Sequence, residues 1–188
     1  MLNTFLIIGR PGSGKSVQAK MLANLMEYKR FSPGEKFREI ATHDTALGNK
    51  IKGIMDSGLL GPSWLSIYLF QNVILNIEDS EGIVFEGVGR KEEEAKKFDE
   101  TAKWLDRDYK VIDVVVSEEE ITKRLALRKN KESREDDDPE DVIVRIKEYD
   151  THTLPAIDFF KSIGKYIEIN GEQTVEVVHK ELIKKINK

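Results

Sequence analysis

Cysteine is absent from this sequence: none of its 188 residues carries a thiol. This absence excludes disulfides, thiolate zinc sites and a cysteine nucleophile. Histidine is almost as scarce, since His43, His152 and His179 are the three in the chain, and they are not at metal-ligand spacing. We therefore expect the histidines to be surface or helix-packing residues rather than metal ligands.

Long apolar runs are also missing. The N-terminal stretch MLNTFLIIGRPG has no basic region ahead of its apolar run, and that run is too short for a signal peptide or a membrane span. A net charge of −4 weighs against nonspecific nucleic-acid binding, and no segment interleaves basic and aromatic residues as a single-strand groove does. We expect a monomeric, cytoplasmic protein with no nucleic-acid or membrane partner.

What the chain does contain suits one folded domain over residues 1–188. Hydrophobic residues make up 39% and charged residues 34%, as is typical of a globular protein with a charged surface. Apolar, β-rich runs lie at residues 4–8, 82–85, 110–116 and 165–169, with a shorter candidate at 28–32. Helix-like segments alternate with them, at 15–28, 64–78, 91–105, 118–129, 139–154 and 173–186. This alternation predicts an α/β fold, a five-stranded parallel sheet with helices on both faces.

A glycine-rich stretch follows the first apolar run. GRPGSGKS, residues 9–16, matches G-x-x-x-x-G-K-[ST] between a predicted strand and a predicted helix, which is the context the motif requires. Glycines let backbone N–H groups converge on phosphate oxygens, Lys15 adds a charge for the β- and γ-phosphates, and Ser16 can face Mg²⁺. The motif predicts a P-loop NTPase-type sheet that binds a nucleoside triphosphate. A GTPase would need N-K-x-D, and the nearest string, NKES at 130–133, ends in serine and does not follow a strand.

Several arginines follow the phosphate loop along the chain. Phosphoryl transfer between two nucleotides brings many negative oxygens together, and its catalysis is mostly positioning plus charge stabilisation. An enzyme of this kind therefore needs arginines that converge on one cleft. The candidates, each by itself more typical of a solvated surface charge, are Arg38, Arg90, Arg124, Arg128, Arg134 and Arg145.

Six strings stand in one order along the chain: GRPGSGKSVQ, SPGEKFR, EGVGR, RLALR at 124–128, the set Arg134, Asp136, Asp137 and Arg145, and RIKEYDTHTLPAIDFF. This order resembles the short-lid adenylate kinases of the nucleoside monophosphate kinase family. The family's versions are GxPGSGKGTQ, STGDxLR, DGFPR, RLxxR, R(x)DD…R and RLxxY…T.PL..YY. Each string is moderately specific, but the ordered combination is highly specific and covers essentially the whole chain.

The resemblance implies a role for each matching position. ATP would be bound by Gly12, Ser13, Gly14, Lys15, Ser16, Val17, Arg124 and Arg128. The acceptor monophosphate would be bound by Pro33, Arg38, Leu59, Leu60, Gly61, Gly87, Arg90, Glu94, Arg134 and Arg145. The catalytic residues would be Lys15, Arg90, Arg128, Arg134 and Arg145, while Ser16 and Glu86 would serve Mg²⁺, partly through water. An acceptor-binding segment would span residues 32–62, and a short lid at 129–137 would close to exclude water.

The sequence departs from the family pattern at several of these positions. Ser16-Val17 replaces Gly-Thr, which brings a hydroxyl into the position that faces Mg²⁺; alternatively, Ser16 only caps the helix. Pro33 replaces a threonine near the acceptor base. Glu86 reaches one methylene further than the family aspartate, and Gly89 frees a backbone that the family proline fixes.

Glu94 is the most informative departure, because the family reads adenine with a glutamine there. A glutamine can donate to adenine N1 and accept from the amino group, whereas an ionised glutamate only accepts. Guanine offers two adjacent donors, which suit a carboxylate better. Alternatively, Glu94 belongs to the exposed run KEEEAKK and is merely solvated.

The leading prediction is reversible, Mg²⁺-dependent transfer of the γ-phosphate of ATP to AMP, giving two ADP without a covalent intermediate. The alternatives within the same class are a guanylate or a pyrimidine monophosphate kinase. The alternative from another class is a non-catalytic nucleotide-binding relative, which the altered Ser16-Val17 and Glu86 positions keep open.

Overall fold

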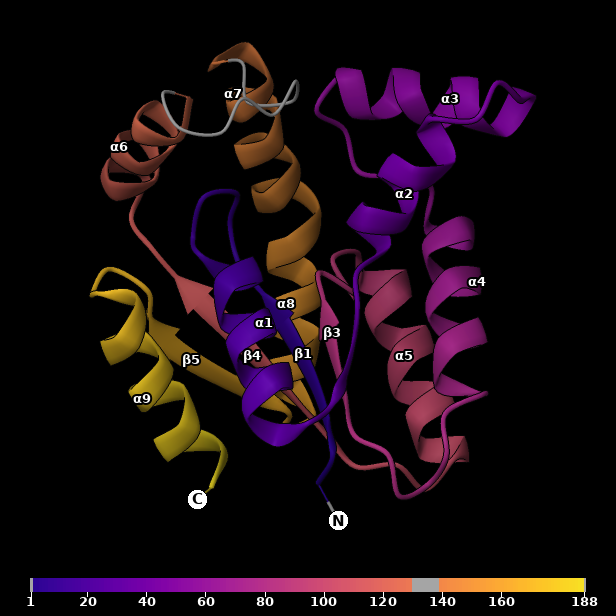
Figure 1. Cartoon of the computed structure of the whole chain (residues 1–188), viewed down its shortest axis with the longest axis vertical. Coiled ribbons are helices and arrows are strands. Elements are labelled where there is room, and N and C mark those ends of the chain that lie inside the picture. Colours follow the sequence, from indigo (N-terminus) through magenta and orange to yellow (C-terminus); the bar gives the residue numbers. More distant parts are fainter. Residues whose placement is uncertain (1, 130–138, 188) are drawn as a thin grey trace.

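The structure is a computed structural model that describes residues 2–129 and 139–187, with the backbone alone described at 125–129 and 139–142. Figure 1 shows the arrangement of the elements. Their order is β1 (Thr4–Ile8), α1 (Lys15–Met26), β2 (Lys29–Phe31), α2 (Pro33–Ala41), α3 (Ala46–Asp56), α4 (Ser63–Ile74), β3 (Ile83–Glu86), α5 (Glu92–Trp104), β4 (Tyr109–Val115), α6 (Glu118–Lys129), α7 (Pro139–Glu148), the π-helical turn η1 (Tyr149–Thr153), α8 (Leu154–Ser162), β5 (Tyr166–Asn170) and α9 (Val175–Ile186).

The five strands form one sheet in the order β2-β3-β1-β4-β5, and every neighbouring pair is parallel. The predicted five-stranded parallel sheet is therefore confirmed. The strand order reverses at β1, whose carboxyl end leads directly into the phosphate loop at residues 9–16. Open α/β sheets bind their ligands at such a point, beyond the carboxyl ends of the strands.

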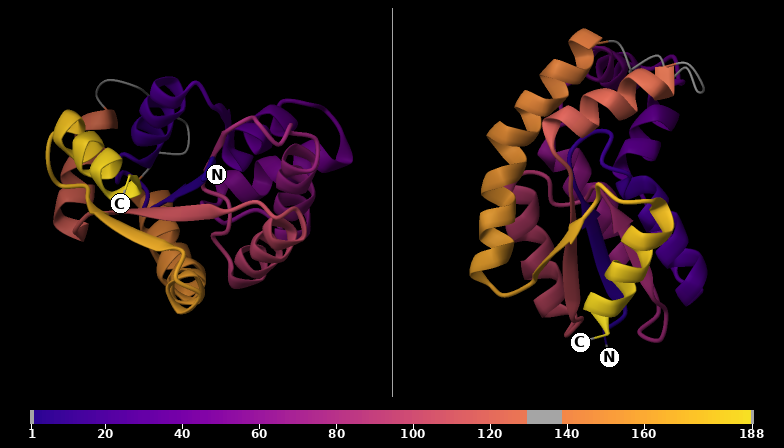
Figure 2. Two further views of the ribbon diagram at one scale, coloured as in Figure 1. Left: turned by 90° about the horizontal axis from the view of Figure 1, so that it is seen from below. Right: turned by 90° about the vertical axis from the view of Figure 1, so that its left-hand side faces the viewer.

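Helices cover both faces of the sheet, as predicted. Helices α1 and α9 pack on one face, while α4, α5 and α8 form the layer on the other (Figure 2). Side chains alternate along β1, so Phe5 and Ile7 face the first layer and Leu6 and Ile8 face the second. All four are buried, which is why β1 reads as a continuous apolar run in the sequence.

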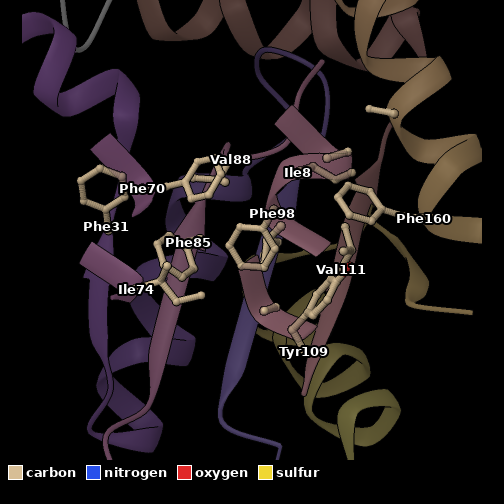
Figure 3. Close-up of a cluster of buried hydrophobic side chains, with 14 of the residues drawn as sticks. Ile8, Phe31, Phe70, Ile74, Phe85, Val88, Phe98, Tyr109, Val111 and Phe160 are labelled. Carbon is tan, nitrogen blue, oxygen red and sulfur yellow. The ribbon is translucent and has the colours of Figure 1, made fainter. Parts of the chain in front are cut away.

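The larger core lies between the sheet and helices α4, α5 and α8, and aromatic rings dominate it (Figure 3). The ring of Phe98 lies edge-to-face with Phe85 and Tyr109, at centroid distances of 5.3 Å and 5.1 Å. The Tyr109 hydroxyl donates to Asp99 at 2.9 Å, which satisfies its one buried donor. This core holds β3 and β4 in place and so determines where their carboxyl ends lie.

The helices beside the carboxyl ends of the strands differ from the sequence pattern. Helices α2 and α3 lie within the predicted acceptor-binding segment, and neither was predicted as a helix. Both contain glycine, which disfavours a helix in sequence-based prediction. The helix predicted over 139–154 corresponds to α7 and η1, and α8 extends beyond its predicted end to Ser162. A single π-helical turn shifts the apolar pattern by about one residue, and periodicity over so short a segment does not locate such a shift.

In Figure 1, α2 and α3 rise above the sheet on one side, and α6 and α7 rise on the other. The phosphate loop lies at the carboxyl end of β1, on the side of α6 and α7 in this view. Across residues 2–129 and 139–187, no helix is both long enough and apolar enough to cross a membrane.

Candidate active site

The phosphate loop turns sharply between β1 and α1. Gly9 has a φ of +147°, and a Cβ there would lie 2.8 Å from the Val114 carbonyl oxygen, so a larger residue does not fit. The Ser13 N–H donates to the Arg10 carbonyl at 3.1 Å, which closes the turn. Gly14 precedes α1 with no side-chain cap, so the first N–H groups of α1 face the loop, as in phosphate-binding sites.

Arg10 links this loop to α6 and η1 through ion pairs. Its guanidinium forms ion pairs with Glu118 at 3.0 Å and Asp150 at 2.8 Å, and it lies 5.5 Å from the centre of the Tyr149 ring. The Arg10 carbonyl accepts a hydrogen bond from Lys15 Nζ at 3.3 Å. Sequence reasoning missed Arg10, because it occupies a variable position of the loop motif and its partners are distant in the sequence.

Ser16 and Glu86 meet at the mouth of the loop. The Ser16 hydroxyl donates to Glu86 Oε1 at 2.5 Å, so Ser16 does more than cap the helix. The other oxygen of Glu86 forms an ion pair with Arg30 at 2.6 Å, and Arg30 also binds both oxygens of Glu35 at 2.6 Å and 2.7 Å. The structure thus brings together the two predicted Mg²⁺ residues, and it adds Arg30, which sequence reasoning missed.

These groups fit a Mg²⁺ ion that arrives with a nucleotide. The described residues contain no cluster of three His, Cys, Asp or Glu side chains that could hold a metal alone. Mg²⁺ in nucleotide-binding sites keeps several waters and takes most other ligands from phosphate oxygens, so one hydroxyl and one carboxylate are a suitable protein contribution. Ser16 would supply the hydroxyl, and Glu86 would supply the carboxylate for a metal-bound water.

A pocket lies beside the loop, at the carboxyl ends of the strands. Its lining joins the loop, α2, the segment before α4 and the α7–η1 junction: Gly9, Pro11, Lys15, Gly34, Phe37, Arg38, Met55, Gly58, Leu59, Leu60, Gly61, Arg90, Arg145, Glu148, Tyr149 and Thr153. The structure therefore brings the predicted residues Lys15, Arg38, Arg90 and Arg145 around one space, together with the predicted acceptor wall at 59–61.

The arginines of this pocket repel one another. Burial lowers the pKa of Arg90. The charges of Glu94 and Glu86 oppose that shift, while repulsion from Arg145 and Arg38 acts in the same direction as burial. Among the described residues, no carboxylate lies within 4.0 Å of the Arg38 or Arg90 guanidinium, whereas Arg30 has two such partners. Like charges held close together cost free energy that a bound anion offsets, so the pocket suits a phosphate group.

Two charged residues outside the prediction hold the wall of the pocket. Glu148 Oε2 accepts a hydrogen bond from the Leu60 N–H at 3.1 Å, and Lys91 Nζ donates to the Gly61 carbonyl at 3.1 Å. A Cβ on Gly61 would lie 2.3 Å from the Phe37 ring, so this position also requires glycine. Each of these contacts joins residues that are distant in sequence, so no local motif could have identified Glu148 or Lys91.

Glu94 is buried, with 4% of its surface exposed, so its interpretation as a solvated residue of a charged run is wrong. It stands at the third position of α5, and its Oε2 accepts a hydrogen bond from the Arg90 N–H at 3.1 Å, just ahead of the helix. An acidic residue at this position commonly reaches back to an N–H at the helix start. Burial raises the pKa of Glu94, although the charges of Arg90 and Lys91 oppose the shift.

The loop EGVGR owes its shape to its second glycine. Gly89 has a φ of +74°, which proline cannot adopt because its ring fixes φ near −65°. The family proline at this position is therefore incompatible with the backbone seen here. Gly87 also has a positive φ, +70°, and Val88 between them is fully buried, so the loop delivers Arg90 to the pocket from a firmly packed base.

The other predicted residues lie around the loop. Arg124 bonds to Glu120 at 2.7 Å, the Gly171 carbonyl at 2.8 Å and the Ser13 carbonyl at 3.4 Å, which places it against the phosphate loop. The Val17 side chain is exposed, and Pro33 is the buried first residue of α2. The side chain of Arg128, together with Arg134 and the predicted lid from 130 onward, lies outside the described residues.

Comparisons with known proteins agree with the order of motifs. A family model described as "Adenylate kinase" matches residues 7–165. The chain is 34% identical over 169 residues to an adenylate kinase of Cyanothece sp. (strain PCC 7425), with 89% of this chain and 87% of that protein covered. It is 32% identical over 186 residues to one of Leptospira biflexa, covering 98% and 100%, and 33% identical over 188 residues to one of Bacteroides fragilis, covering 100% and 99%.

Proposed function

Since this chain belongs to the adenylate kinase family, we propose that it transfers the γ-phosphate of ATP to AMP in a reversible, Mg²⁺-dependent reaction that yields two ADP. Family membership makes the chain a phosphotransferase that acts on nucleotides. The acceptor base, the dependence on Mg²⁺ and the roles of individual residues are the proposed parts of this function.

One observation carries the proposal: a loop built for triphosphate and a pocket lined by three arginines share Lys15, Gly9 and Pro11 as common lining. Two nucleotides bound on these two sides would meet at Lys15. Holding both phosphates in line removes most of the entropic cost of the reaction, and the surrounding cations stabilise the charge on the transferring group.

The phosphate loop would bind the donor nucleotide, ATP. The N–H groups at the start of α1 and the Lys15 ammonium bind the phosphates of ATP. Arg124, which bonds to the Ser13 carbonyl of the loop, contacts the donor nucleotide beyond its phosphates. Mg²⁺, when bound with ATP, neutralises phosphate charge. Ser16 and Glu86 are the residues that would hold it, the latter through water.

The arginine pocket would bind the acceptor nucleotide, the monophosphate. Arg38 and Arg90 grip the phosphate of the monophosphate, and Arg145 stabilises the group in transfer. Arg128 and Arg134 join it in this role by their family positions. No residue forms a covalent intermediate, because the oxygen of the acceptor phosphate attacks the γ-phosphorus directly and ADP leaves.

The acceptor base is the part on which Glu94 bears. A neutral carboxyl group offers one donor and one acceptor, as the amide of glutamine does, and the edge of adenine needs that pair. The burial that raises the pKa of Glu94 favours this neutral form and supports AMP. An ionised Glu94, favoured by the charge of Arg90, would instead suit guanine, which makes GMP the second candidate acceptor.

The test is a panel of acceptors. The chain is incubated with ATP, MgCl₂ and AMP, GMP, CMP or UMP in turn, and ADP formation is followed in a coupled assay. We expect AMP to give the largest kcat/KM. Absence of transfer to every monophosphate, with ATP binding still measurable by calorimetry, would show a non-catalytic nucleotide-binding protein and would overturn the proposal.

A further inference from the structure

Arg30 is the residue that joins the two halves of the site. It lies on β2, opposite Val84 of β3, and its side chain is 20% exposed. One nitrogen, Nη1, donates to Glu86 Oε2 at 2.6 Å, and the other, Nη2, binds both oxygens of Glu35 at 2.6 Å and 2.7 Å. A single guanidinium therefore bridges two carboxylates from different elements.

These contacts are unlike an ordinary surface ion pair. The side chain of Glu86 is 10% exposed, so its charge is poorly solvated and depends on partners within the protein. Both of its oxygens are in use, one by Arg30 and the other by the Ser16 hydroxyl. With one oxygen held by Arg30, the orientation of the carboxylate is fixed, and the second oxygen is aimed at Ser16.

The second partner of Arg30 extends this arrangement to the acceptor side. Glu35 lies in the first turn of α2, and Arg38 of the same helix lines the arginine pocket three residues later. Any movement of α2 when a monophosphate binds would act on Glu35 and so on Arg30. The contacts run from Glu35 through Arg30 to Glu86 and Ser16, and Arg38 belongs to the same helix as Glu35.

We propose that Arg30 is a positioning residue for the transfer reaction: it holds one oxygen of Glu86 so that the other faces Ser16, and it ties this pair to α2 through Glu35. The inference rests on the proposed function, because Glu86 and Ser16 are the residues assigned to Mg²⁺. Arg30 touches no reacting atom, and its effect is exerted through Glu86.

The geometry requires arginine at this position. A guanidinium presents several N–H groups in a fixed plane and can serve two carboxylates at once, whereas an ammonium is a point charge with no fixed fork. Arg30→Lys therefore keeps the charge and removes the bridge. This variant separates positioning from a simple electrostatic effect.

The first measurement is calorimetric binding of the β,γ-imido analogue of ATP, with MgCl₂ and with EDTA. In Arg30→Lys we expect the gain in affinity that Mg²⁺ provides to fall by about tenfold, as is typical when the partner of a metal-site residue is removed, and the affinity in EDTA to stay the same. In the transfer assay, kcat should fall by about as much, while KM for AMP changes little.

Two further variants complete the design. Glu35→Gln leaves the Arg30–Glu86 contact in place and should show a smaller loss, and combining it with Arg30→Lys should add nothing. Lys29→Gln removes the neighbouring cation on β2, which pairs with Glu81 and is 57% exposed, and it should leave both measurements unchanged. Melting curves would identify any variant that fails to fold, in which case Glu35→Gln alone decides.

The proposal is overturned if Arg30→Lys matches the wild type in both measurements, or if it weakens analogue binding equally with and without Mg²⁺. Should Arg30→Lys fail to fold, wild-type behaviour of Glu35→Gln overturns it instead. Failure of the proposed function looks different: the wild type would transfer phosphate to no acceptor, yet the calorimetric comparison would still test Arg30.

Discussion

Two groups of charges lie at the carboxyl ends of the same sheet, and they are arranged in opposite ways. In the first, Ser16, Glu86, Arg30 and Glu35 are matched to one another, with every contact between 2.5 Å and 2.7 Å. In the second, the arginine pocket around Arg38, Arg90 and Arg145, like charges face one another. Burial lowers the pKa of Arg90, the charges of Glu94 and Glu86 oppose that shift, and repulsion from Arg145 and Arg38 acts in the same direction as burial.

The difference shows which group is built to be completed by a ligand. A matched cluster is stable by itself and keeps its members in a defined geometry, which suits the orientation of a metal-bound water. A pocket of cations carries an electrostatic cost that an anion offsets, which suits binding and stabilisation of a transferring phosphate. Four substitutions test this contrast.

The largest effect should come from Arg90→Met, which removes a cation from the arginine pocket. We expect kcat for AMP to fall by about 100- to 1,000-fold, because one preorganised donor at a developing charge is typically worth that much. Affinity for the ATP analogue should be unchanged, since Arg90 lies on the acceptor side. Lys36→Met, which removes an exposed charge from α2, is the control and should behave as wild type.

Glu86→Gln should have the next largest effect, because it breaks the matched cluster. The amide keeps the size of the side chain but loses the ion pair with Arg30 and the charge that faces Ser16. We expect kcat to fall by about 10- to 100-fold and the Mg²⁺ concentration for half-maximal activity to rise. An unchanged Mg²⁺ titration would contradict the assignment of Glu86 to the metal.

Glu94→Gln tests how the acceptor base is read. If the neutral carboxyl selects AMP, the ratio of kcat/KM for AMP to that for GMP should fall as pH rises through the raised pKa of Glu94. In Glu94→Gln the ratio should be independent of pH and, at alkaline pH, about tenfold higher than in the wild type, the value of one hydrogen bond to a charged group.

The neighbouring variant Glu93→Gln removes an exposed carboxylate of the same helix turn and should leave the ratio unaltered. If Glu94→Gln also leaves the ratio as it is in the wild type at every pH, Glu94 serves only to accept the Arg90 N–H at the start of α5, and the base is read elsewhere.

The smallest expected effect is on stability, and it comes from Asp113, a buried carboxylate that forms no ion pair among the described residues. Asp113 on β4 accepts a hydrogen bond from the Tyr166 hydroxyl at 3.0 Å, and the Tyr149 hydroxyl also stabilises its charged form. Burial raises the pKa of Asp113, so the folded state binds its proton more tightly than the unfolded state. Its contribution to stability is therefore greatest below the ordinary pKa of aspartate and is lost as pH rises to the raised pKa.

Asp113→Asn has no such loss, so its melting temperature relative to wild type should increase between pH 4 and pH 8, by about 2 to 4 °C for each kcal/mol involved. Asp108 provides a control of opposite sign, because the hydrogen bond from Lys165 lowers its pKa. Asp108→Asn should lose stability at neutral pH and approach wild type as pH falls through the lowered pKa. Parallel pH profiles for the two variants would contradict both assignments.

The sequence was sufficient for the parts of the site that depend on local pattern. The phosphate loop was identified because its glycines, Lys15 and Ser16 are adjacent and follow a buried strand. Arg38 and Arg90 line one pocket because each follows a strand of a parallel sheet, and such strands end at one edge. The five parallel strands were predicted because strands buried on both faces are apolar throughout.

Other parts could not be found in this way. Arg10, Arg30, Lys91 and Glu148 reach partners that are between 5 and 140 residues away, and each is an unremarkable charge in its own segment. The helices α2 and α3 contain Gly34, Gly48 and Gly53, and glycine disfavours a helix in sequence-based prediction. The alternative interpretation of Glu94 as a solvated residue was wrong, although most of its neighbours in KEEEAKK are at least partly exposed.

The order of apolar runs, glycines and arginines along the chain was thus enough to predict the layer architecture, the glycine-rich loop after β1 and the arginines that follow the strands. The fold sets which opposite charges form pairs and which like charges face one another. That outcome depends on distances between elements that are remote in sequence. Glu86 becomes a partner of Arg30 and Ser16 because β2, β3 and α1 pack side by side. Arg90 faces Arg38 and Arg145 because α2 and α7 lie on either side of the carboxyl end of β3.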